Sequence, residues 1–257
     1  MTAQLFGLLT RIRLSRRPTN LDKAAADQYL FPLVGMVVGL VATSVALVLN
    51  EFMNKDMALI SGGAVLVSLY FVTGILHTEG LADFADGMMA SGSMEKKRQV
   101  MKDVHLGAGG VFATAMFLIL FFASTSVLTG DAGRRIELWP FLILRVPLAF
   151  GFVLAEVAGK LSMNVMMFMG PSSHEGMGSA FVRKASGSKL AASIAISTAI
   201  AIIFAGHLFP LVFLGLIAGV TVTALARKHF GGVSGDSFGA ANEVGRLLTL
   251  VGWVLLA

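Results

Sequence analysis

The sequence predicts an all-α, polytopic integral membrane protein, a helical bundle of about seven transmembrane helices with a cytoplasmic N-terminus. Three observations support this fold class. Of the 257 residues, 56% are hydrophobic and only 14% are charged, whereas about a quarter of the residues in a soluble domain are charged. The mean hydropathy is +0.80, and apolar stretches long enough to cross a bilayer recur along the whole chain. Lys and Arg gather in alternate connections between these stretches.

Seven apolar stretches account for most of the chain, and polar or glycine-rich residues separate them. The first starts with Phe31-Pro32, where a proline fits the first turn of a helix. The second ends beside His77, and the third begins within the glycine-rich residues 107–110. The last two are short for a membrane span, and the apolar segment 161–170 either extends the fourth span or lies in the membrane interface. The expected spans are Leu30–Leu49, Met57–Leu76, Ala108–Thr129, Leu138–Ala158, Leu190–Gly206, Pro210–Ala226 and Val244–Ala257.

The basic residues predict the orientation, because cytoplasmic loops are enriched in Lys and Arg. With the N-terminus inside, sixteen of the 20 Lys and Arg residues fall in inner connections, three (Lys55, Arg134 and Arg135) fall outside, and Arg145 lies within the fourth span. We therefore expect one membrane-embedded catalytic domain, 1–257, in the cell membrane, with a basic cytoplasmic segment at 1–29 and a site on the cytoplasmic face. The sixteen inner residues are Arg11, Arg13, Arg16, Arg17, Lys23, Lys96, Lys97, Arg98, Lys102, Lys160, Arg183, Lys184, Lys189, Arg227, Lys228 and Arg246.

The composition also excludes several kinds of function. The chain has no cysteine, which excludes disulfides, thiolate metal sites and thiol catalysis. Its net charge of +5 arises from residues between the spans and not from one soluble face. The lipid bilayer is therefore the expected partner of these charges, and nucleic acid is not.

Three carboxylates form the most informative pattern in the chain. Glu79, Asp83 and Asp86 stand at i, i+4 and i+7, so on a helix they share one narrow face. Like charges this close repel one another, and a divalent cation turns that repulsion into a binding site. Hard oxygen ligands suit Mg²⁺, with Mn²⁺ as the alternative. A solvated acidic helix edge is less favoured, because two glycines lie within the stripe and residues 78–93 include no Lys or Arg.

Two further constellations lie in connections assigned to the same side. Asp103 precedes a glycine-rich entry to the third span, where backbone N–H groups could hold a phosphate or the glycines could pack against a helix. The basic residues at 96–98 are best explained by orientation alone. Asp236, Gly239 and Glu243 form a second acidic stripe at the mouth of the last span, and we expect Asp236 to approach the first stripe through glycine-mediated helix packing.

Three single residues leave more than one interpretation open. Arg145, as a charge within a span, needs a partner, which could be a site carboxylate, a substrate phosphate or Glu156. Glu175 lies in a polar loop at 171–178 whose chemistry is unspecific. His77 adjoins the acidic stripe but points to nearly the opposite side of a regular helix, and a functional role and a structural role are equally favoured.

The segment 73–87, Thr-Gly-Ile-Leu-His-Thr-Glu-Gly-Leu-Ala-Asp-Phe-Ala-Asp-Gly, resembles the signature of the cobalamin synthase family, the adenosylcobinamide-GDP ribazoletransferases. The resemblance continues in order through 31–35, 101–110, Arg145, 175–178 and 231–243. Departures are modest. Glu79 stands where the family usually has Asp, Lys102 where Arg is common, Val104 where Ser is common, and Arg246 where Glu is frequent.

This resemblance implies a magnesium-dependent transferase. It would join adenosylcobinamide-GDP to α-ribazole or α-ribazole 5′-phosphate, give adenosylcobalamin or its 5′-phosphate, and release GMP. Other cobalamin-assembly enzymes are candidate partners, and self-association is left open. The expected catalytic residues are Asp83, Asp86, Asp103 and His77. The expected metal ligands are Glu79, Asp83, Asp86, Asp103 and Asp236, and the expected substrate-binding residues are Lys102, Arg145, Glu175, Asp236 and Glu243.

Two alternatives belong to other families. The Asp83-x-x-Asp86-Gly87 pattern is similar to that of the CDP-alcohol phosphotransferases, although the spacing after it is not. A cation-coupled transporter would also contain several spans and intramembrane acids. The acids here cluster at one face, and no repeat of spans is visible, which disfavours transport.

Overall fold

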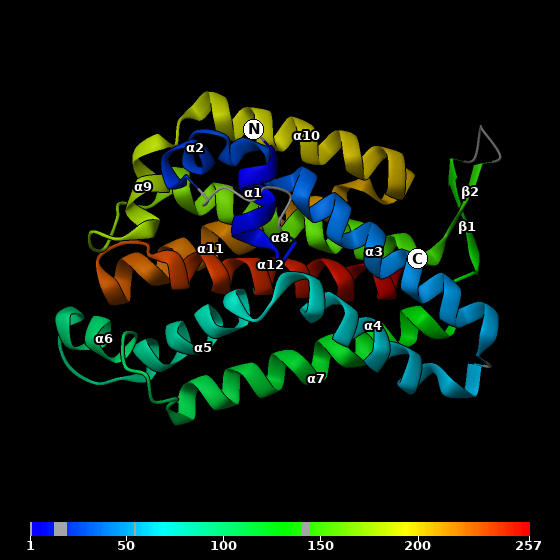
Figure 1. Ribbon diagram of the computed structural model, residues 1–257, viewed down its shortest axis with the longest axis horizontal. Helices are drawn as coiled ribbons and strands as arrows, with labels where there is room; N and C mark the ends of the chain where they lie inside the picture. The colour runs from blue at the N-terminus through cyan, green and yellow to red at the C-terminus, as the bar shows by residue number, and fades with distance from the viewer. Residues whose placement is uncertain (1, 13–19, 54, 140–143) are drawn as a thin grey trace.

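The computed structural model describes residues 2–12, 20–53, 55–139 and 144–257. Arg13, Arg16 and Arg17, which the orientation argument counted as inner residues, lie outside this part of the chain. The long helices run nearly parallel to one axis (Figure 1). The helices are α1 (Thr2–Leu9), α2 (Leu21–Ala26), η1 (Gln28–Leu30), α3 (Phe31–Phe52), η2 (Lys55–Met57), α4 (Ala58–Thr73), α5 (Leu76–Met89), α6 (Met94–Val100), α7 (Ala108–Gly130), η3 (Leu148–Phe150), α8 (Gly151–Met169), α9 (Met177–Lys184), α10 (Gly187–Ala205), η4 (Gly206–Phe213), α11 (Leu214–Phe230) and α12 (Gly235–Leu256).

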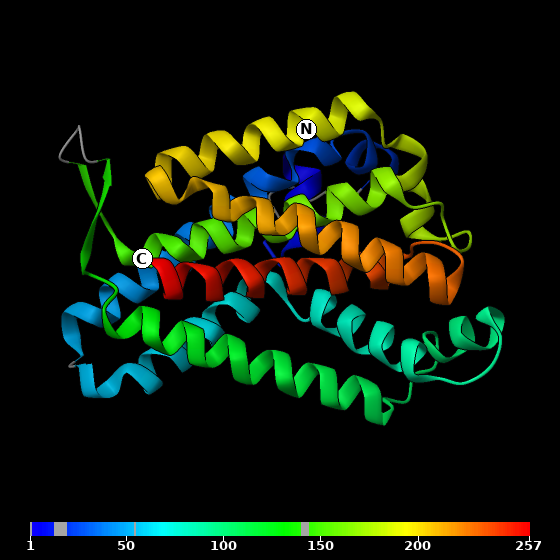
Figure 2. The same cartoon turned by 180° about the vertical axis from the view of Figure 1, so that it is seen from behind.

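Five helical segments of the described chain are long and apolar enough to cross a membrane, so the structure supports a polytopic helical protein and does not confirm the count of seven. The fifth segment is 44 residues long and combines two expected spans. In it α10 and α11 run in opposite directions on either side of η4 (Figure 2). Helix α12 is not among the five, because polar residues in its first half lower its hydropathy. The five segments are Gln28–Phe52, Lys55–Thr73, Ala108–Gly130, Leu148–Met169 and Gly187–Phe230.

The prediction for the fourth span was wrong by about ten residues. Instead of a helix from Leu138, the chain forms an antiparallel hairpin of β1 (Arg135–Trp139) and β2 (Leu144–Pro147). In the register of its two strands, the backbone of Glu137 lies opposite that of Arg145. Pro147 ends β2 directly before η3, and proline disfavours helix in the residue before it. The helix therefore starts late and takes in the apolar segment 161–170 that the sequence left unassigned. Arg145 lies in a strand and not within a membrane span.

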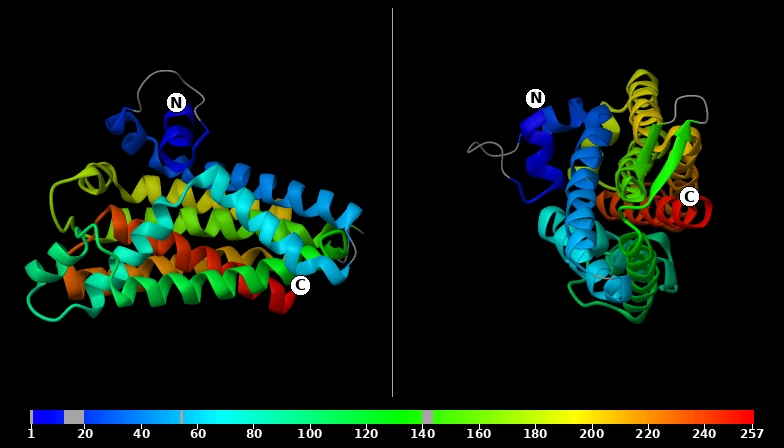
Figure 3. Two further views of the ribbon diagram at one scale, coloured as in Figure 1. Left: turned by 60° about the horizontal axis from the view of Figure 1, so that its bottom comes forward. Right: turned by 90° about the vertical axis from the view of Figure 1, so that its right-hand side faces the viewer.

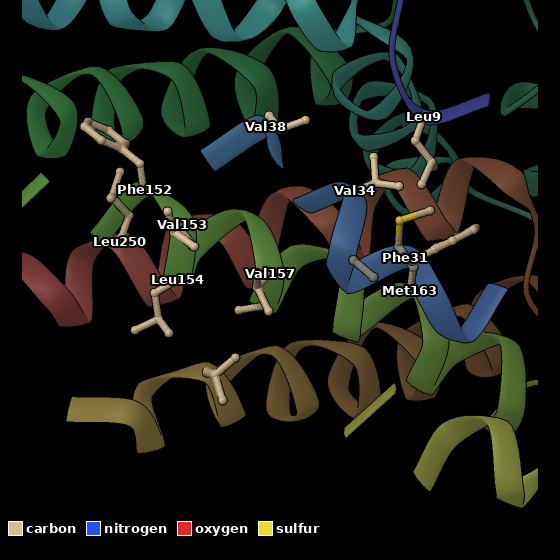
Figure 4. Packing of buried hydrophobic residues seen from close by; sticks show 14 of the residues in the cluster. Leu9, Phe31, Val34, Val38, Phe152, Val153, Leu154, Val157, Met163 and Leu250 are labelled. Atoms are coloured by element: carbon tan, nitrogen blue, oxygen red, sulfur yellow. The ribbon is translucent and has the colours of Figure 1, made fainter. Parts of the chain in front are cut away.

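Helix α8 forms the centre of the bundle. In the most apolar stretch of the segment Leu148–Met169, 89% of the residues are buried. Helices α3, α10, α11 and α12 surround α8. Helices α5 and α7 pack on the other side of α12, and α4 packs against α7 and α3. Small residues allow the closest approaches: a Cβ on Gly39 would lie 2.4 Å from the Val153 Cα. Around this centre Phe152, Val153 and Leu154 of α8 project in different directions into the core (Figure 4). The short helices α1 and α2 lie on the outside of the bundle, next to α3 (Figure 3).

The crossing of α5 and α12 positions the acidic residues. A Cβ on Gly80 would lie 2.7 Å from the Asp236 carbonyl oxygen, and one on Gly239 would lie 2.8 Å from the His77 carbonyl oxygen. Only glycine permits the two backbones to come this close. The sequence prediction of a close approach was therefore correct, although Gly235, the glycine directly before Asp236, has nothing within 4 Å of its Cβ position.

The structure also revises the distribution of positive charge. Lys160 and Arg246, which were assigned to inner connections, are buried within α8 and α12, at 0% and 1% exposure. Arg145 moves to the hairpin, with Lys55, Arg134 and Arg135 at the same end of the bundle. Eleven described basic residues precede α3 or lie where helices join at the α6 end. They are Arg11, Lys23, Lys96, Lys97, Arg98, Lys102, Arg183, Lys184, Lys189, Arg227 and Lys228.

Candidate active site

A cavity of about 940 Å³ lies between α5, α7, α12 and the 101–106 loop. Helix α5 contributes Glu79 and Asp83, α12 contributes Asp236, and the loop contributes Lys102 and Asp103. Five of the sequence-predicted site residues therefore come together, although more than 150 positions separate the first from the last. Tyr70, Thr78 and Thr114 complete the polar part of the lining.

Negative charge is crowded around Asp83. Burial, followed by the nearby carboxylates of Asp236, Glu79 and Asp86, raises the pKa of the Asp83 carboxyl to about 6. None of the ion pairs in the described residues involves Glu79, Asp83 or Asp236. The site therefore holds acidic groups whose mutual repulsion a bound cation would relieve.

The carboxylates fit a magnesium ion only if a substrate phosphate supplies further ligands to the same ion. No group of three or more Asp, Glu or His side chains in the described residues is close enough to hold a metal ion by itself. Mg²⁺ is usually bound through one or two carboxylates together with substrate phosphates, and not in an all-protein cage. Glu79, Asp83 and Asp236 supply suitable oxygen donors, and they would hold Mg²⁺ or Mn²⁺ jointly with a phosphorylated substrate.

Asp86 has a different position from the rest of its stripe. Its side chain is buried, and its two oxygens accept hydrogen bonds from the backbone N–H groups of Gly107 (2.8 Å) and Gly110 (2.7 Å). These N–H groups begin α7, so the anion at this glycine-rich helix start is Asp86 and not a substrate phosphate. A Cβ on Gly107 would lie 2.4 Å from the same carboxylate. Asp86 does not line the cavity.

Asp103 lines the cavity from its outer edge. Its carboxylate is half exposed and accepts hydrogen bonds from the backbone N–H of His105 (3.0 Å) and from the His105 Nδ1 (2.8 Å). These hydrogen bonds lower the pKa of the Asp103 carboxyl. The Asp103 carboxylate is therefore ionised and accessible, and its position is set by the 101–106 loop and not by α5.

His77 lies outside this cavity. It is buried on the opposite side of α5, as the helical period indicated, and lines a second, smaller cavity. The assignment of His77 to the catalytic group beside Asp83 is therefore not supported by its position.

Glu243 lies one layer behind the cavity, in a buried ionic cluster. The Thr78 hydroxyl, which lines the cavity, donates to Glu243 Oε1 at 3.3 Å. Arg246 contacts Glu243 Oε2 at 2.8 Å and Glu156 Oε1 at 3.1 Å, with all three side chains buried. Glu156, which was considered as a partner for Arg145, is paired with Arg246. Glu243 supports the cavity wall through Thr78 and does not reach the cavity itself.

Two predicted substrate-binding residues lie away from the cavity. Glu175 is exposed and accepts hydrogen bonds from Arg183 (2.9 Å) and Ser179 (3.1 Å) at the start of α9. The backbone of Arg145 belongs to the hairpin at the end of the bundle opposite α6 (Figure 1).

His174 belongs to the polar 171–178 loop, whose chemistry the sequence left unspecific, and it does not line the acidic cavity. Hydrogen bonds join its loop to the loop before α12, from the Ser173 N–H to the Val233 carbonyl and from the Val233 N–H to the Pro171 carbonyl. Burial lowers the pKa of His174, the Lys102 charge lowers it further, and Asp236 opposes both. The charges of Lys102 and Asp236 therefore both act on the His174 imidazole. Its sequence context, a serine-rich loop between spans, gave no periodicity from which this could be found.

The fold and the site define a helical, polytopic membrane protein with an acidic cavity suited to a phosphorylated ligand. The chain belongs to the cobalamin-5-phosphate synthase family, whose model matches residues 2–254. It is similar to the adenosylcobinamide-GDP ribazoletransferase of Methanocella arvoryzae, with 34% identity over 89% of this chain and 85% of that protein. The enzymes of the same name from Halorubrum lacusprofundi (31%; 95% and 92%) and Methanococcoides burtonii (29%; 96% and 88%) are also similar. No solved structure matches.

Proposed function

We propose that this protein is a transferase of a late step in cobalamin biosynthesis. It joins adenosylcobinamide-GDP to α-ribazole, or to α-ribazole 5′-phosphate, and releases GMP. The observation that carries the proposal is the set of carboxylates Glu79, Asp83 and Asp236 around one cavity, which form no ion pair with the described residues, in a chain of this family. Residues 1–257 act as one membrane-embedded catalytic unit, and association with other assembly enzymes or with a second copy stays a prediction.

In the reaction, a ribose hydroxyl oxygen of the acceptor forms a bond to the cobinamide-linked phosphorus. The bond from that phosphorus to the GMP oxygen breaks, and the hydroxyl proton is lost. Such phosphoryl transfer depends mostly on positioning and charge stabilisation. Mg²⁺, when bound, supplies neutralisation of the pyrophosphate charge. Lys102, which lines the cavity from the 101–106 loop, binds a phosphate oxygen. The Thr78 hydroxyl donates a 3.2 Å hydrogen bond to the Tyr70 hydroxyl, and this bond fixes the two side chains in the cavity wall.

The protein crosses the cell membrane seven times, with α12 and the two halves of Gly187–Phe230 added to the four other segments. Both the N-terminus and the acidic cavity face the cytoplasm. Eleven basic residues on that side against four at the hairpin end support this orientation. The cytoplasmic face is also where the nucleotide-linked donor is expected.

The experiment that tests the function uses purified protein in proteoliposomes. Adenosylcobinamide-GDP, α-ribazole and Mg²⁺ are added, and released GMP is measured by chromatography. We expect GMP release that requires both substrates, stops with EDTA and returns with added Mg²⁺ or Mn²⁺. GMP release without acceptor would indicate a hydrolase instead, and no release under any condition would contradict the proposal.

A further inference from the structure

The acidic cavity is not acidic along its whole length. Lys102 and Asp103 line it from the 101–106 loop, which directly precedes α7. Thr114 and Leu118 line it from α7 itself, about 9 and 15 Å along the helix axis from the first residue of that helix. The cavity therefore extends from the loop along α7, well beyond the charged residues of the loop.

The end of the cavity furthest from the loop is formed by Tyr70, Ile75 and Leu118, and we call it the inner end. Helices α4 and α7 pack side by side in opposite directions (Figure 1), and a Cβ on Gly62 would lie 2.7 Å from the Ser126 Cα. Counting the same number of residues forward from Gly62 and back from Ser126 gives Tyr70 and Leu118, which are therefore level with each other. Ile75, which directly precedes α5 and is 66% exposed, lines the cavity beside them.

The carboxylates follow the inner end in order along α5. Glu79 comes one helical turn after Ile75, about 6 Å along the axis, and Asp83 comes one turn later. Asp236 lies beside this stretch, since a Cβ on Gly80 would lie 2.7 Å from the Asp236 carbonyl oxygen. An aromatic and aliphatic end is thus followed directly by the acidic groups, and the lysine of the loop comes last.

We propose that the inner end binds the aromatic base of the acceptor, an inference that rests on the proposed function. The base of α-ribazole is a flat, bicyclic dimethylbenzimidazole. Tyr70 offers it an aromatic side chain, and Ile75 and Leu118 offer aliphatic ones. With the base at the inner end, the attached ribose lies one helical turn further along α5, at Glu79 and Asp83. The ribose hydroxyls then lie beside the carboxylates, where the transfer needs the attacking oxygen.

The guanine of the donor fits the inner end less well. Its edge carries several hydrogen-bonding groups, and burying such groups without partners costs free energy. The Tyr70 hydroxyl already accepts a hydrogen bond from Thr78 at 3.2 Å, and Ile75 and Leu118 offer no polar side-chain atom. A lipid acyl chain matches the apolar side chains as well, but it would place no hydroxyl group beside the carboxylates.

The test measures equilibrium binding of α-ribazole to the protein in phosphatidylcholine proteoliposomes, together with KM for both substrates. Leu118→Trp fills the inner end, and we expect Kd and KM for α-ribazole to rise about tenfold or more. KM for adenosylcobinamide-GDP should not change. The α-riboside of unsubstituted benzimidazole lacks the methyl groups and should lose less affinity in this variant than α-ribazole does.

The matched control is Leu120→Trp, the same substitution on the same helix. Leu120 is 51% exposed and does not line the cavity, so binding of α-ribazole should stay unchanged. A second pair of variants tests the aromatic contact. Tyr70→Leu removes the ring and should weaken α-ribazole binding about two- to tenfold, whereas Tyr70→Phe keeps the ring and should weaken it less.

Unchanged binding of α-ribazole in Leu118→Trp and Tyr70→Leu would overturn the base site, and it is the result expected if lipid occupies the inner end. An equal loss for the two ribosides, or an equal rise in KM for donor and acceptor, would indicate structural damage and would overturn it too. These results with normal GMP release by the wild-type protein would refute the base site alone. Binding of α-ribazole with the expected pattern but without any GMP release would support the base site and refute the proposed function.

Discussion

Asp83 and Asp86 are three residues apart on one helix and have different surroundings. Asp83 faces the acidic cavity beside Asp236 and Glu79, whereas Asp86 binds the first N–H groups of α7. The sequence pattern assigned both to a metal site because it shows only which face of the helix a residue occupies. Which neighbour meets that face depends on where α7 begins in space.

Asp83→Asn should lower GMP release by at least about a hundredfold, because it removes a charge that acts on the transferring phosphate. The isosteric amide should leave thermal stability within about 1 kcal/mol of wild type, since it relieves repulsion from Asp236 and Glu79. Initial rates and thermal unfolding in detergent would measure both effects. Near-normal activity in Mg²⁺ would remove Asp83 from the site.

Asp86→Ala should mainly affect folding, because it leaves the N–H groups of Gly107 and Gly110 buried without an acceptor. We expect a loss of about 1–3 kcal/mol in the free energy of unfolding. Hydrogen exchange should show faster opening at the start of α7 than in Asp83→Ala. Equal stability of the two alanine variants would contradict the assigned role of Asp86.

At the scale of elements, the α5–α12 contact brings the acidic groups together. The period of each helix predicts two acidic stripes, but only the glycine contacts determine that the stripes face one cavity. The same crossing separates His77 from Glu79 and Asp83 and places it in another cavity. The packing of α5 against α12 therefore decides which of the sequence-predicted site residues share one cavity.

Gly80→Ala should separate the two helices, because the new methyl group would lie 2.7 Å from the Asp236 backbone oxygen. Such overpacking costs about 1–3 kcal/mol and would shift Asp236 out of register with Asp83. Both GMP release and the unfolding temperature should fall. Gly63→Ala in α4 is the matched control, since its methyl would meet only Phe122 at 3.6 Å. If Gly80→Ala behaves like this control, the crossing does not set the site geometry.

Arg246→Ala should be strongly destabilising, because it leaves Glu156 and Glu243 buried without a positive partner. Removing one member of a buried ion pair typically costs about 3–5 kcal/mol. The packing of the guanidinium over the Phe121 ring, 4.4 Å from its centroid, would be lost as well. Arg183→Ala, which breaks the exposed pair with Glu175, should change stability little. Unfolding in a denaturant series would compare the two variants.

At the scale of the whole molecule, the distribution of charge and the proposed function favour the same orientation independently of each other. Most described basic residues lie on the side of the acidic cavity, and the hairpin end holds few. Ser91 and Asp56 are exposed at opposite ends of the bundle, which makes them suitable positions for cysteine in this cysteine-free chain.

In sealed cells Ser91→Cys should resist an impermeant thiol reagent, and Asp56→Cys should react with it. Both should react once the cells are permeabilised, which controls for accessibility. The opposite labelling pattern would place the acidic cavity outside the cell and contradict the proposed function as well as the topology.

The sequence by itself determined that this is a polytopic helical protein with acidic residues grouped on one side, because hydrophobic length, helical period and basic-residue bias are local properties of the chain. It also placed Glu79 and Asp83 on one helix face, since their spacing fixes that face, and the approach of Asp236 was an expectation from the glycines beside it. It misplaced the fourth span, because the mainly apolar segment 138–147 fits a helix or a hairpin until neighbouring segments compete for it. Only the tertiary structure decided that Asp86 binds the α7 N-terminus, that Arg246 neutralises two buried acids and that His77 faces a separate cavity. Each of these outcomes is a contact between helices that are far apart in the chain. The sequence pattern of a single helix does not show which other helix it will contact.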